Sequence, residues 1–531
     1  MTNTPWFYPD KVSAATGESV TLFASSPQSP CTLTVSRIGA RAHQVARFEG
    51  IEIGQHPTPE NADQNGCGWP EVFQFTVGED WASGYYDLVL EAPDGARSHH
   101  FVCVRKATSA RKADAVIVLA TNTYMAYNYW GGSNSYADVE GLLAGRLSPD
   151  ESRPGAIGRL SRMRPYPQTL IAPPQGAPRL INMVPRGVGE MAFPGDLEWA
   201  QTHRPSPYDG SACFLQKWEN VFAAWADEQG YEIDYLTDHD FEDTGTDWLS
   251  GYKTVLIVGH SEYWSGKQRT EIDAFTERGG NLAVFSGNTC YWKIRWEDDG
   301  QTMIAHKWRG HLDDPLWEDP NTRSDATHLW SHDAFDAPEA ELIGLSFIYG
   351  GYHRIAMCAS RGAAGFTIYD DQHWALDGTD LYYGDVLGTQ VPLIGYENDG
   401  CPLRFGPDGL PKPDGGLGVP QNLEIIGIAP ATLAESDCSP YPKMIPQEES
   451  EIRARMAYGA DDPETIDRLM RGHSVLASFK RGEGEVFNSG TTEWVHGLGA
   501  KDPFVEQITH NVLERFGMQP KPTSQDAGEI S

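Results

Sequence analysis

The first hundred residues of the chain contain short apolar runs separated by turn residues. Runs at 19–23, 32–35, 72–77 and 85–90 are rich in Val, Leu, Phe, Thr and Tyr, with Pro, Gly, Asn and Asp between them. Short segments of this composition and spacing are typical of strands in an all-β sandwich. We therefore predict a small immunoglobulin-like β-sandwich over residues 1–105, followed by a polar linker.

After the linker the pattern changes to alternating strands and helices. Residues 115–120 form a continuous apolar run, as expected for a strand buried on both faces, and residues 254–259 form the clearest predicted strand. Between them, aromatic residues recur near helical spacing over 214–229. This alternation predicts an α/β catalytic domain over residues 112–517, with a mostly parallel sheet and long inserted loops. We expect residues 518–531 to form a polar tail.

Charge and cysteine content restrict the partners and the compartment. The chain has 531 residues, with 74 acidic and 41 basic side chains and a formal net charge of −33. Such a surface repels phosphate backbones and anionic lipids, so we expect no nucleic-acid and no membrane partner. The eight cysteines include no C-x-x-C pair, and no signal peptide begins the chain. These features predict a cytoplasmic protein with reduced thiols.

Candidate chemistry follows the ends of the predicted strands. In open parallel sheets, ligands bind beyond the carboxyl ends of the strands. The strands predicted at 115–120, 254–259, 281–285 and 391–395 each lead into polar or aromatic residues. We expect these side chains to face one crevice; they are Tyr127, His260, Glu262, Asn288 and Glu397.

The segment after residue 259 supports more than one interpretation. His260 and Glu262 lie two apart on extended chain, so their side chains leave the strand on the same side. Such a pair can move protons near neutral pH or help to hold a metal, although either residue could also be a hydrogen-bonded strand end. Ser261 stands where a nucleophile elbow has its serine, but Tyr263 replaces the second glycine of that motif. Serine catalysis is therefore the weaker alternative.

Three strings of the sequence resemble one known family. They are Gly-His-Ser-Glu-Tyr-Trp at 259–264, Ala-Tyr-Asn-x-Trp-Gly-Gly at 126–132 and Gly-Glu-Val-Phe-Asn-Ser-Gly-Thr-Thr-Glu-Trp at 484–494. The chain resembles the catalytic part of the N,N-dimethylformamidase large (beta) subunit family over about residues 112–517, without its lectin-like domain. The resemblance implies a sheet similar to glutamine-amidotransferase-like (flavodoxin-like) folds.

The resemblance also implies a metal centre. Members of the family hold mononuclear iron, expected to be ferric, with two tyrosines and a glutamate. Carried onto this sequence, these ligands fall on Glu262, Tyr127 and Tyr166, with Tyr208 as the alternative for the second tyrosine. His260, Asn288 and Glu397 then become catalytic residues that transfer protons or stabilise developing charge.

Together these observations predict an iron-dependent amidohydrolase that cleaves the C–N bond of a small amide, with or without N-substituents. The predicted protein is a homo-oligomer with a small companion subunit. Two alternatives remain open at this stage. One is a binding protein without catalysis that recognises a carbohydrate or small molecule, and the other is a metal-free hydrolase that uses Ser261.

Overall fold

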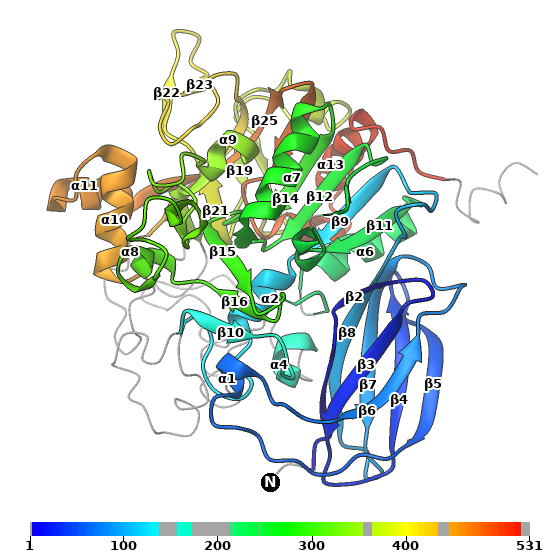
Figure 1. The fold of residues 1–531 in the computed structure, drawn as a ribbon. Helices are drawn as coiled ribbons and strands as arrows, with labels where there is room; N and C mark the ends of the chain where they lie inside the picture. The colour runs from blue at the N-terminus through cyan, green and yellow to red at the C-terminus, as the bar shows by residue number, and fades with distance from the viewer. Residues whose placement is uncertain are drawn as a thin grey trace, which may run out of the picture.

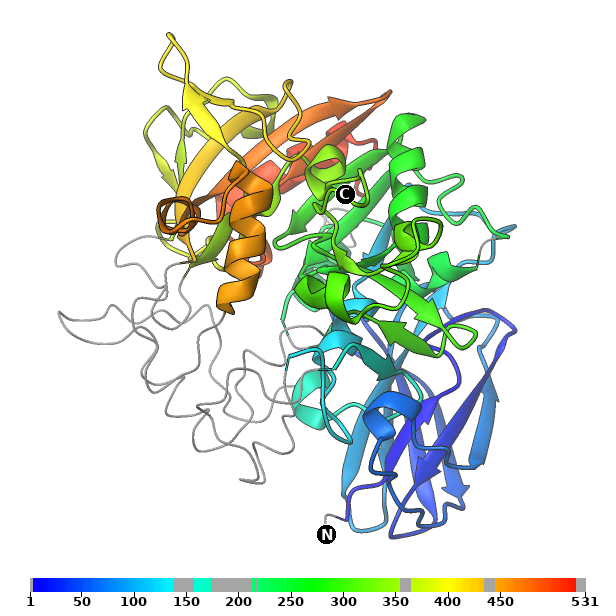
Figure 2. The ribbon, with the colours of Figure 1, turned by 60° about the vertical axis from the view of Figure 1, so that its left-hand side comes forward.

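A computed structural model describes most of the chain. It covers residues 3–136, 157–172, 213–215, 217–243, 245–353, 364–433 and 445–521. Figure 1 shows a body built mainly of strands at the N-terminal end and a larger body in which a long twisted sheet is flanked by helices. The N-terminus lies at the far end of the smaller body (Figure 2).

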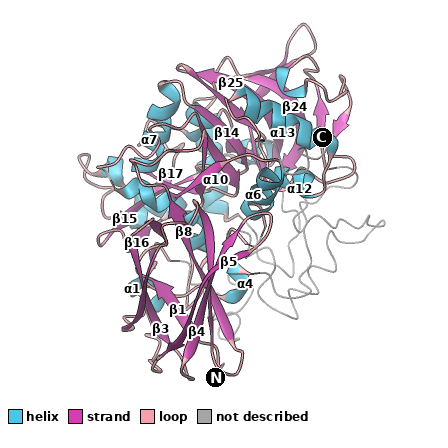
Figure 3. Cartoon of the chain, turned by 90° about the vertical axis from the view of Figure 1, so that its right-hand side faces the viewer, coloured by secondary structure: helices cyan, strands magenta, loops and turns pink. Residues whose placement is uncertain are grey.

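The smaller body consists of two β-sheets that share one apolar core (Figure 3). One sheet has the order β1-β3-β6 and the other β2-β8-β7-β4-β5. Strand β4 alternates buried and half-buried residues, which is the pattern of a strand with one face toward the core. The strands are β1 (Trp6–Pro9), β2 (Ser13–Ala15), β3 (Ser19–Ser25), β4 (Cys31–Ile38), β5 (His43–Ile51), β6 (Glu71–Thr76), β7 (Gly84–Glu91) and β8 (Arg97–Arg105), with helix α1 (Ala62–Asn65) before β6.

The central sheet of the larger body has the order β11-β9-β12-β14-β26-β25-β24-β18-β21, with β19 and β20 attached beside β24. From β11 to β26 neighbouring strands are parallel, and from β26 to β21 they are antiparallel. The strands are β9 (Ala115–Leu119), β11 (Ile233–Thr237), β12 (Thr254–Gly259), β14 (Asn281–Ser286), β18 (Ser346–His353), β19 (Phe366–Ile368), β20 (Val386–Leu387), β21 (Tyr396–Gly400), β24 (Glu424–Thr432), β25 (Arg471–Arg481) and β26 (Gly484–Asn488).

The prediction of a mostly parallel α/β sheet resembling glutamine-amidotransferase-like (flavodoxin-like) folds is wrong. Among the described pairings of the central sheet, four are parallel and six antiparallel. Apolar runs reveal buried strands but not their direction, which depends on the connection between them. Only Gly482 and Glu483 separate β25 from β26, and so short a connection forces an antiparallel hairpin. The predicted domain boundaries stay a prediction.

Helices cover both faces of the central sheet. Apolar residues of α6 (Glu219–Glu228), α12 (Trp494–Gly499) and α13 (Pro503–Arg515) share one core with Leu256 and Val258 of β12. Residues of α7 (Gly266–Glu277) and α9 (Glu339–Ile343) share a second core with Val255 and Ile257 of the same strand. The alternation of core membership along β12 follows from the period of two in a strand. No described helix is long and apolar enough to cross a membrane.

The remaining elements lie around this framework. The helices are α2 (Thr121–Tyr127), α4 (Gln168–Ile171), α8 (Gly310–Asp313), α10 (Gln447–Tyr458) and α11 (Pro463–Leu469), with short 3-10 turns at Asp238–Glu242, Lys307–Arg309, Arg323–Asp325 and Trp374–Leu376. A small sheet has the order β10-β16-β15-β13, with β17 beside β15. Its strands are β10 (Arg159–Ser161), β13 (Tyr263–Ser265), β15 (Trp292–Glu297), β16 (Thr302–Ile304) and β17 (His328–Leu329), and β22 (Leu403–Phe405) and β23 (Pro411–Pro413) form a separate hairpin.

Candidate active site

Five of the predicted site residues meet at one edge of the central sheet. The parallel strands β9, β12 and β14 end at this edge, and the chain continues from them into Tyr127, His260–Glu262 and Asn288. Glu397 arrives differently. The prediction of a strand at 391–395 is wrong, because the strand in this region is β21 (Tyr396–Gly400). Glu397 lies inside β21, on the antiparallel side of the sheet.

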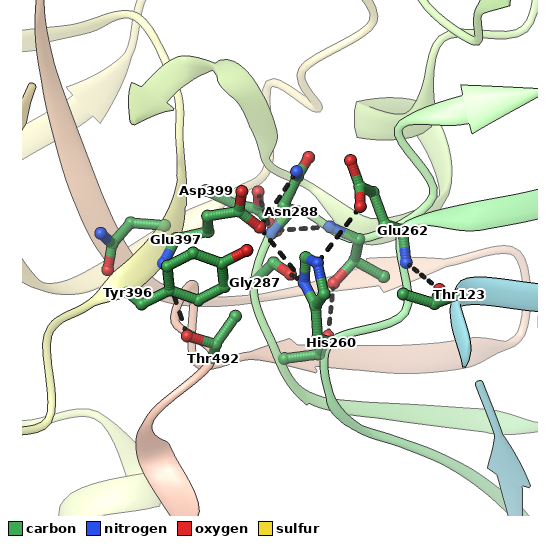
Figure 4. A network of polar contacts seen from close by, with 12 residues as sticks. Thr123, His260, Glu262, Gly287, Asn288, Tyr396, Glu397, Asp399 and Thr492 are labelled. Carbon is green, nitrogen blue, oxygen red and sulfur yellow. Dashed lines mark hydrogen bonds and ion pairs between the residues drawn. The ribbon is translucent and has the colours of Figure 1, made fainter. Parts of the chain in front are cut away.

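His260 is the centre of the cluster (Figure 4). Its Nε2 lies 3.2 Å from Oε2 of Glu262, and its Nδ1 lies 3.2 Å from Oε2 of Glu397. Burial alone would lower the pKa of His260, but the charge of Glu397 and the hydrogen bond and charge of Glu262 outweigh it, so the pKa is raised. One imidazole thus joins two carboxyl groups from segments that are far apart in sequence.

The two carboxyl groups respond in opposite directions. Burial would raise the pKa of Glu262, but its hydrogen bond to His260 and the charges of His260 and Lys307 hold that pKa below its ordinary value. Burial raises the pKa of Glu397 to about 7, although His260 opposes the shift. Glu262 therefore keeps its charge at neutral pH, whereas Glu397 can gain or lose a proton there.

Glu262 is surrounded by side-chain donors. Tyr136 places its hydroxyl 3.0 and 2.8 Å from the two carboxylate oxygens, and Tyr127 places its hydroxyl 3.4 Å from Oε2. The indole N–H of Trp292 donates to Oε1 at 2.7 Å. Burial raises the pKa of Tyr127 and Tyr136 well above the ordinary value, and the charge of Glu262 adds to this effect. Three oxygen-bearing side chains consequently converge on one buried point.

Asn288 links the cluster to the turn after β14. Its Nδ2 donates to Oε2 of Glu397 at 3.2 Å, and its backbone has a φ of +52°. Its backbone N–H donates to Asp399, whose pKa burial raises to about 8. Figure 4 shows Asn288, Glu397 and Asp399 side by side.

Tyr166 lies in different surroundings from the other predicted ligands. It is buried, and its ring packs against His100 and Phe101, with centroid distances of 5.1 and 6.0 Å. The phenols that contact Glu262 are Tyr127 and Tyr136. Tyr208 lies outside the described residues. The assignment of Tyr166 as a ligand stays a prediction.

Tyr136, Lys307 and Asp399 were missed by sequence reasoning. Tyr136 follows closely on the Gly131-Gly132 end of a string that had been recognised, and Asp399 lies two positions after Glu397, so it shares a strand face with it. These were usable signals. Lys307 had none, since it is a single lysine at the start of a short 3-10 turn that is far from Tyr136 in sequence. It is buried, and its Nζ lies 3.6 Å from the ring centroid of Tyr136.

Metal-binding capacity here depends on phenol oxygens. Across the ranges that the structure describes, no group of three or more His, Cys, Asp or Glu side chains could hold a metal ion. One carboxylate and two phenols nevertheless form a set of hard oxygen donors of the kind that suits ferric iron.

A buried histidine between two carboxyl groups of opposite pKa shift is typical of an enzyme acid–base centre. The family described as "N,N-dimethylformamidase beta subunit-like, C-terminal" matches residues 32–507, and the chain belongs to this family. The resemblance inferred from the three sequence strings is confirmed.

Two curated relatives carry the name "N,N-dimethylformamidase beta subunit". The protein from Alcaligenes sp is 28% identical over 96 residues, and that from Paracoccus aminophilus is 26% identical over 96 residues. Each match covers 18% of this chain and 12% of the relative. The chain therefore aligns with only a small part of these relatives.

Proposed function

We propose that this protein is an amidohydrolase that cleaves the C–N bond of small amides with activated water and uses mononuclear iron. The observation that carries the proposal is the position of His260 between Glu262 and Glu397, whose pKa values are shifted apart. Membership of the family and the names of the relatives support an amide as the substrate.

Amide hydrolysis requires two proton transfers. Water loses a proton as it adds to the carbonyl carbon, and the nitrogen gains one as the C–N bond breaks. Glu397 is suited to both steps because burial raises its pKa to about 7. His260 holds the carboxyl group of Glu397 through Nδ1, and Asn288 donates to the same oxygen. Glu397 accordingly takes the proton of water and returns it to the departing amine.

The residues that would hold iron are Glu262, Tyr127 and Tyr136. Their oxygen atoms converge within hydrogen-bond distance, and Glu262 is ionised although it is buried. When bound, ferric iron would supply Lewis acidity toward the amide carbonyl and toward water. Binding requires both phenols to lose their protons, which only a strong positive charge at this point would favour.

Assembly and compartment belong to the same proposal. The relatives are named as beta subunits, which supports a companion subunit for this chain. Homo-oligomerisation stays a prediction. The six cysteines that the structure describes are buried and form no disulfide, which supports a reducing, cytoplasmic setting.

The serine alternative finds no comparable support. The hydroxyl of Ser261 accepts a hydrogen bond from the indole N–H of Trp264 at 2.9 Å, whereas a nucleophilic serine needs a base as its partner. The imidazole of His260 is engaged by Glu262 and Glu397 instead.

The test combines metal analysis with hydrolysis assays on purified protein. Formamide, N-methylformamide and N,N-dimethylformamide are the substrates, and iron is measured together with visible absorption. We expect bound iron, a phenolate-to-iron absorption band and amine release. Glu262→Ala should lose the iron and lower activity by more than about a hundredfold.

The matched control is Ser261→Ala, which should keep most of the activity and all of the iron. Active protein that is colourless and free of iron would overturn the iron assignment. Loss of activity in Ser261→Ala with normal activity in Glu262→Ala would instead favour serine catalysis. Absence of hydrolysis for all three amides would reject the proposed substrate class.

A further inference from the structure

The turn after β14 has an unusual backbone. Asn288 and Cys290 have φ values of +52° and +55°, in the left-handed region that non-glycine residues rarely adopt. Gly287 precedes them in a crowded position, where an added Cβ would lie 2.3 Å from the carbonyl oxygen of Glu397 and 2.7 Å from the backbone nitrogen of Thr492. Such a conformation persists only when neighbouring groups hold it in place.

Asp399 supplies this restraint. Its Oδ1 accepts the backbone N–H of Asn288 at 2.9 Å, and its Oδ2 accepts the backbone N–H of Thr289 at 3.2 Å. The carboxyl group is completely buried, and the backbone N–H of Asp399 donates to Gly490 at 3.0 Å. The two carboxylate oxygens of Asp399 therefore accept hydrogen bonds from two consecutive N–H groups of one turn.

Strand β21 holds Asn288 by two separate contacts. Glu397 and Asp399 lie two positions apart, so their side chains share one face of the strand (Figure 4). Asp399 binds the backbone of Asn288, and Glu397 accepts a hydrogen bond from its carboxamide. The oxygen of Glu397 that takes part is the one that also faces His260.

We propose that Asp399 is a positioning residue that acts through Asn288. It fixes the turn so that the Asn288 carboxamide stays on Glu397 and orients that carboxyl group toward His260. This inference rests on the proposed function, because it assigns Asp399 to the geometry of the same proton-transfer group.

The first test is a double-mutant cycle. Asp399→Asn keeps the size of the side chain but places an NH₂ group against a backbone N–H. We expect kcat to fall about tenfold to a hundredfold while KM changes by less than about twofold, as for a misplaced catalytic group. In an Asn288→Ala background the same substitution should cost almost nothing, because the group through which it acts is gone.

Asp314→Asn is the matched control. Asp314 is also a buried aspartate that accepts two backbone N–H groups, from Leu316 and Thr327, and it pairs with Arg295. We expect Asp314→Asn to lower thermal stability without changing kcat. A kcat loss of equal size in both variants would identify the effect of Asp399→Asn as general destabilisation and overturn the proposal.

A crystal structure of Asp399→Asn gives a readout that does not depend on activity. We expect Asn288 to leave its left-handed conformation and its contact with Glu397. An unmoved Asn288, or an undiminished kcat loss in the Asn288→Ala background, would overturn the proposal even if amide hydrolysis is confirmed. If no amide is hydrolysed, the proposed function fails while the structural arm still decides the role of Asp399.

A second variant covers the case in which Asp399→Asn does not fold. Asp399→Ser retains one hydroxyl acceptor for one of the two N–H groups. We expect Asn288 to be displaced from its contact with Glu397 and kcat to fall by less than in Asn288→Ala, which removes the carboxamide completely. Wild-type kcat in Asp399→Ser together with a displaced Asn288 would overturn the proposal.

Discussion

Two buried carboxyl groups near helix α2 behave differently. Glu219 accepts the backbone N–H of Ala120 at 3.0 Å and the hydroxyl of Tyr124, and burial raises its pKa to about 8. Glu262 is equally buried, yet its pKa is lowered, because the hydrogen bond to His260 and the charges of His260 and Lys307 favour its ionised form. Glu219 avoids the cost of burial by keeping a proton, whereas Glu262 keeps its charge.

The difference indicates that Glu219 has a structural role and Glu262 a functional one. The partners of Glu219 come from the start of one helix, and burial outweighs their effect on its pKa. Those of Glu262 are side chains from several distant segments, including Tyr127, Tyr136 and Trp292. A buried carboxylate that stays ionised among phenols and an imidazole is costly for folding, and such a cost is commonly retained where chemistry requires the charge.

The largest predicted effect is that of Glu397→Gln, which changes the other carboxyl group beside His260. Loss of the general base should lower kcat by about 10² to 10⁴. In the wild-type protein the acidic limb of the pH–activity profile should lie near pH 7, because burial raises the pKa of Glu397 to about 7 and the base must be ionised to accept a proton. Steady-state rates from pH 5 to pH 9 measure both effects.

Glu219→Gln is the control for this prediction, since glutamine resembles the protonated form of Glu219. It should keep the acidic limb and nearly all of the activity. If Glu397→Gln keeps both the acidic limb of the pH–activity profile and the wild-type rate, Glu397 is not a catalytic residue. If Glu219→Gln is inactive, the distinction between a structural Glu219 and a functional site around Glu262 is wrong.

A second prediction concerns the second tyrosine. Tyr136→Phe removes a hydroxyl that contacts both oxygens of Glu262, so we expect iron affinity to fall by at least about tenfold and the visible band to change. Tyr166→Phe should change the band little, because the ring of Tyr166 packs against His100 and Phe101. Metal titration and absorption spectra measure the two variants. The reverse result would favour Tyr166 as the second tyrosine ligand.

The smallest expected effect is on stability. Burial raises the pKa of Glu219 to about 8, whereas an unfolded glutamate titrates near 4.3. Between these values the unfolded chain releases a proton that the folded protein retains, so this group's contribution to stability falls as pH rises from about 4.3 to 8. We expect Glu219→Gln to reduce the fall in melting temperature between pH 6 and pH 8 by about 1–3 °C. An unchanged slope would show that Glu219 is ionised in the folded protein.

Most of the candidate site could be predicted because strand ends are encoded locally. The apolar runs that become β9, β12 and β14 show where each strand stops, and parallel strands bring Tyr127, His260 and Asn288 to one edge. Glu397 was correctly expected near this group for the wrong reason, since it lies within β21 rather than after a strand at 391–395. Lys307 could not be found, because its contact with Tyr136 joins two segments that are far apart in sequence.

The sequence alone determined the family, the existence of the buried strands and the string around His260 and Glu262. These features are set by local composition and by the period of two along a strand. The tertiary structure decided the direction of half of the central sheet, the phenols that contact Glu262 and the restraint of Asn288 by Asp399. The contacts of the phenols with Glu262 and of Asp399 with Asn288 join segments more than a hundred residues apart. Local periodicity carries no information about which distant segments pack together.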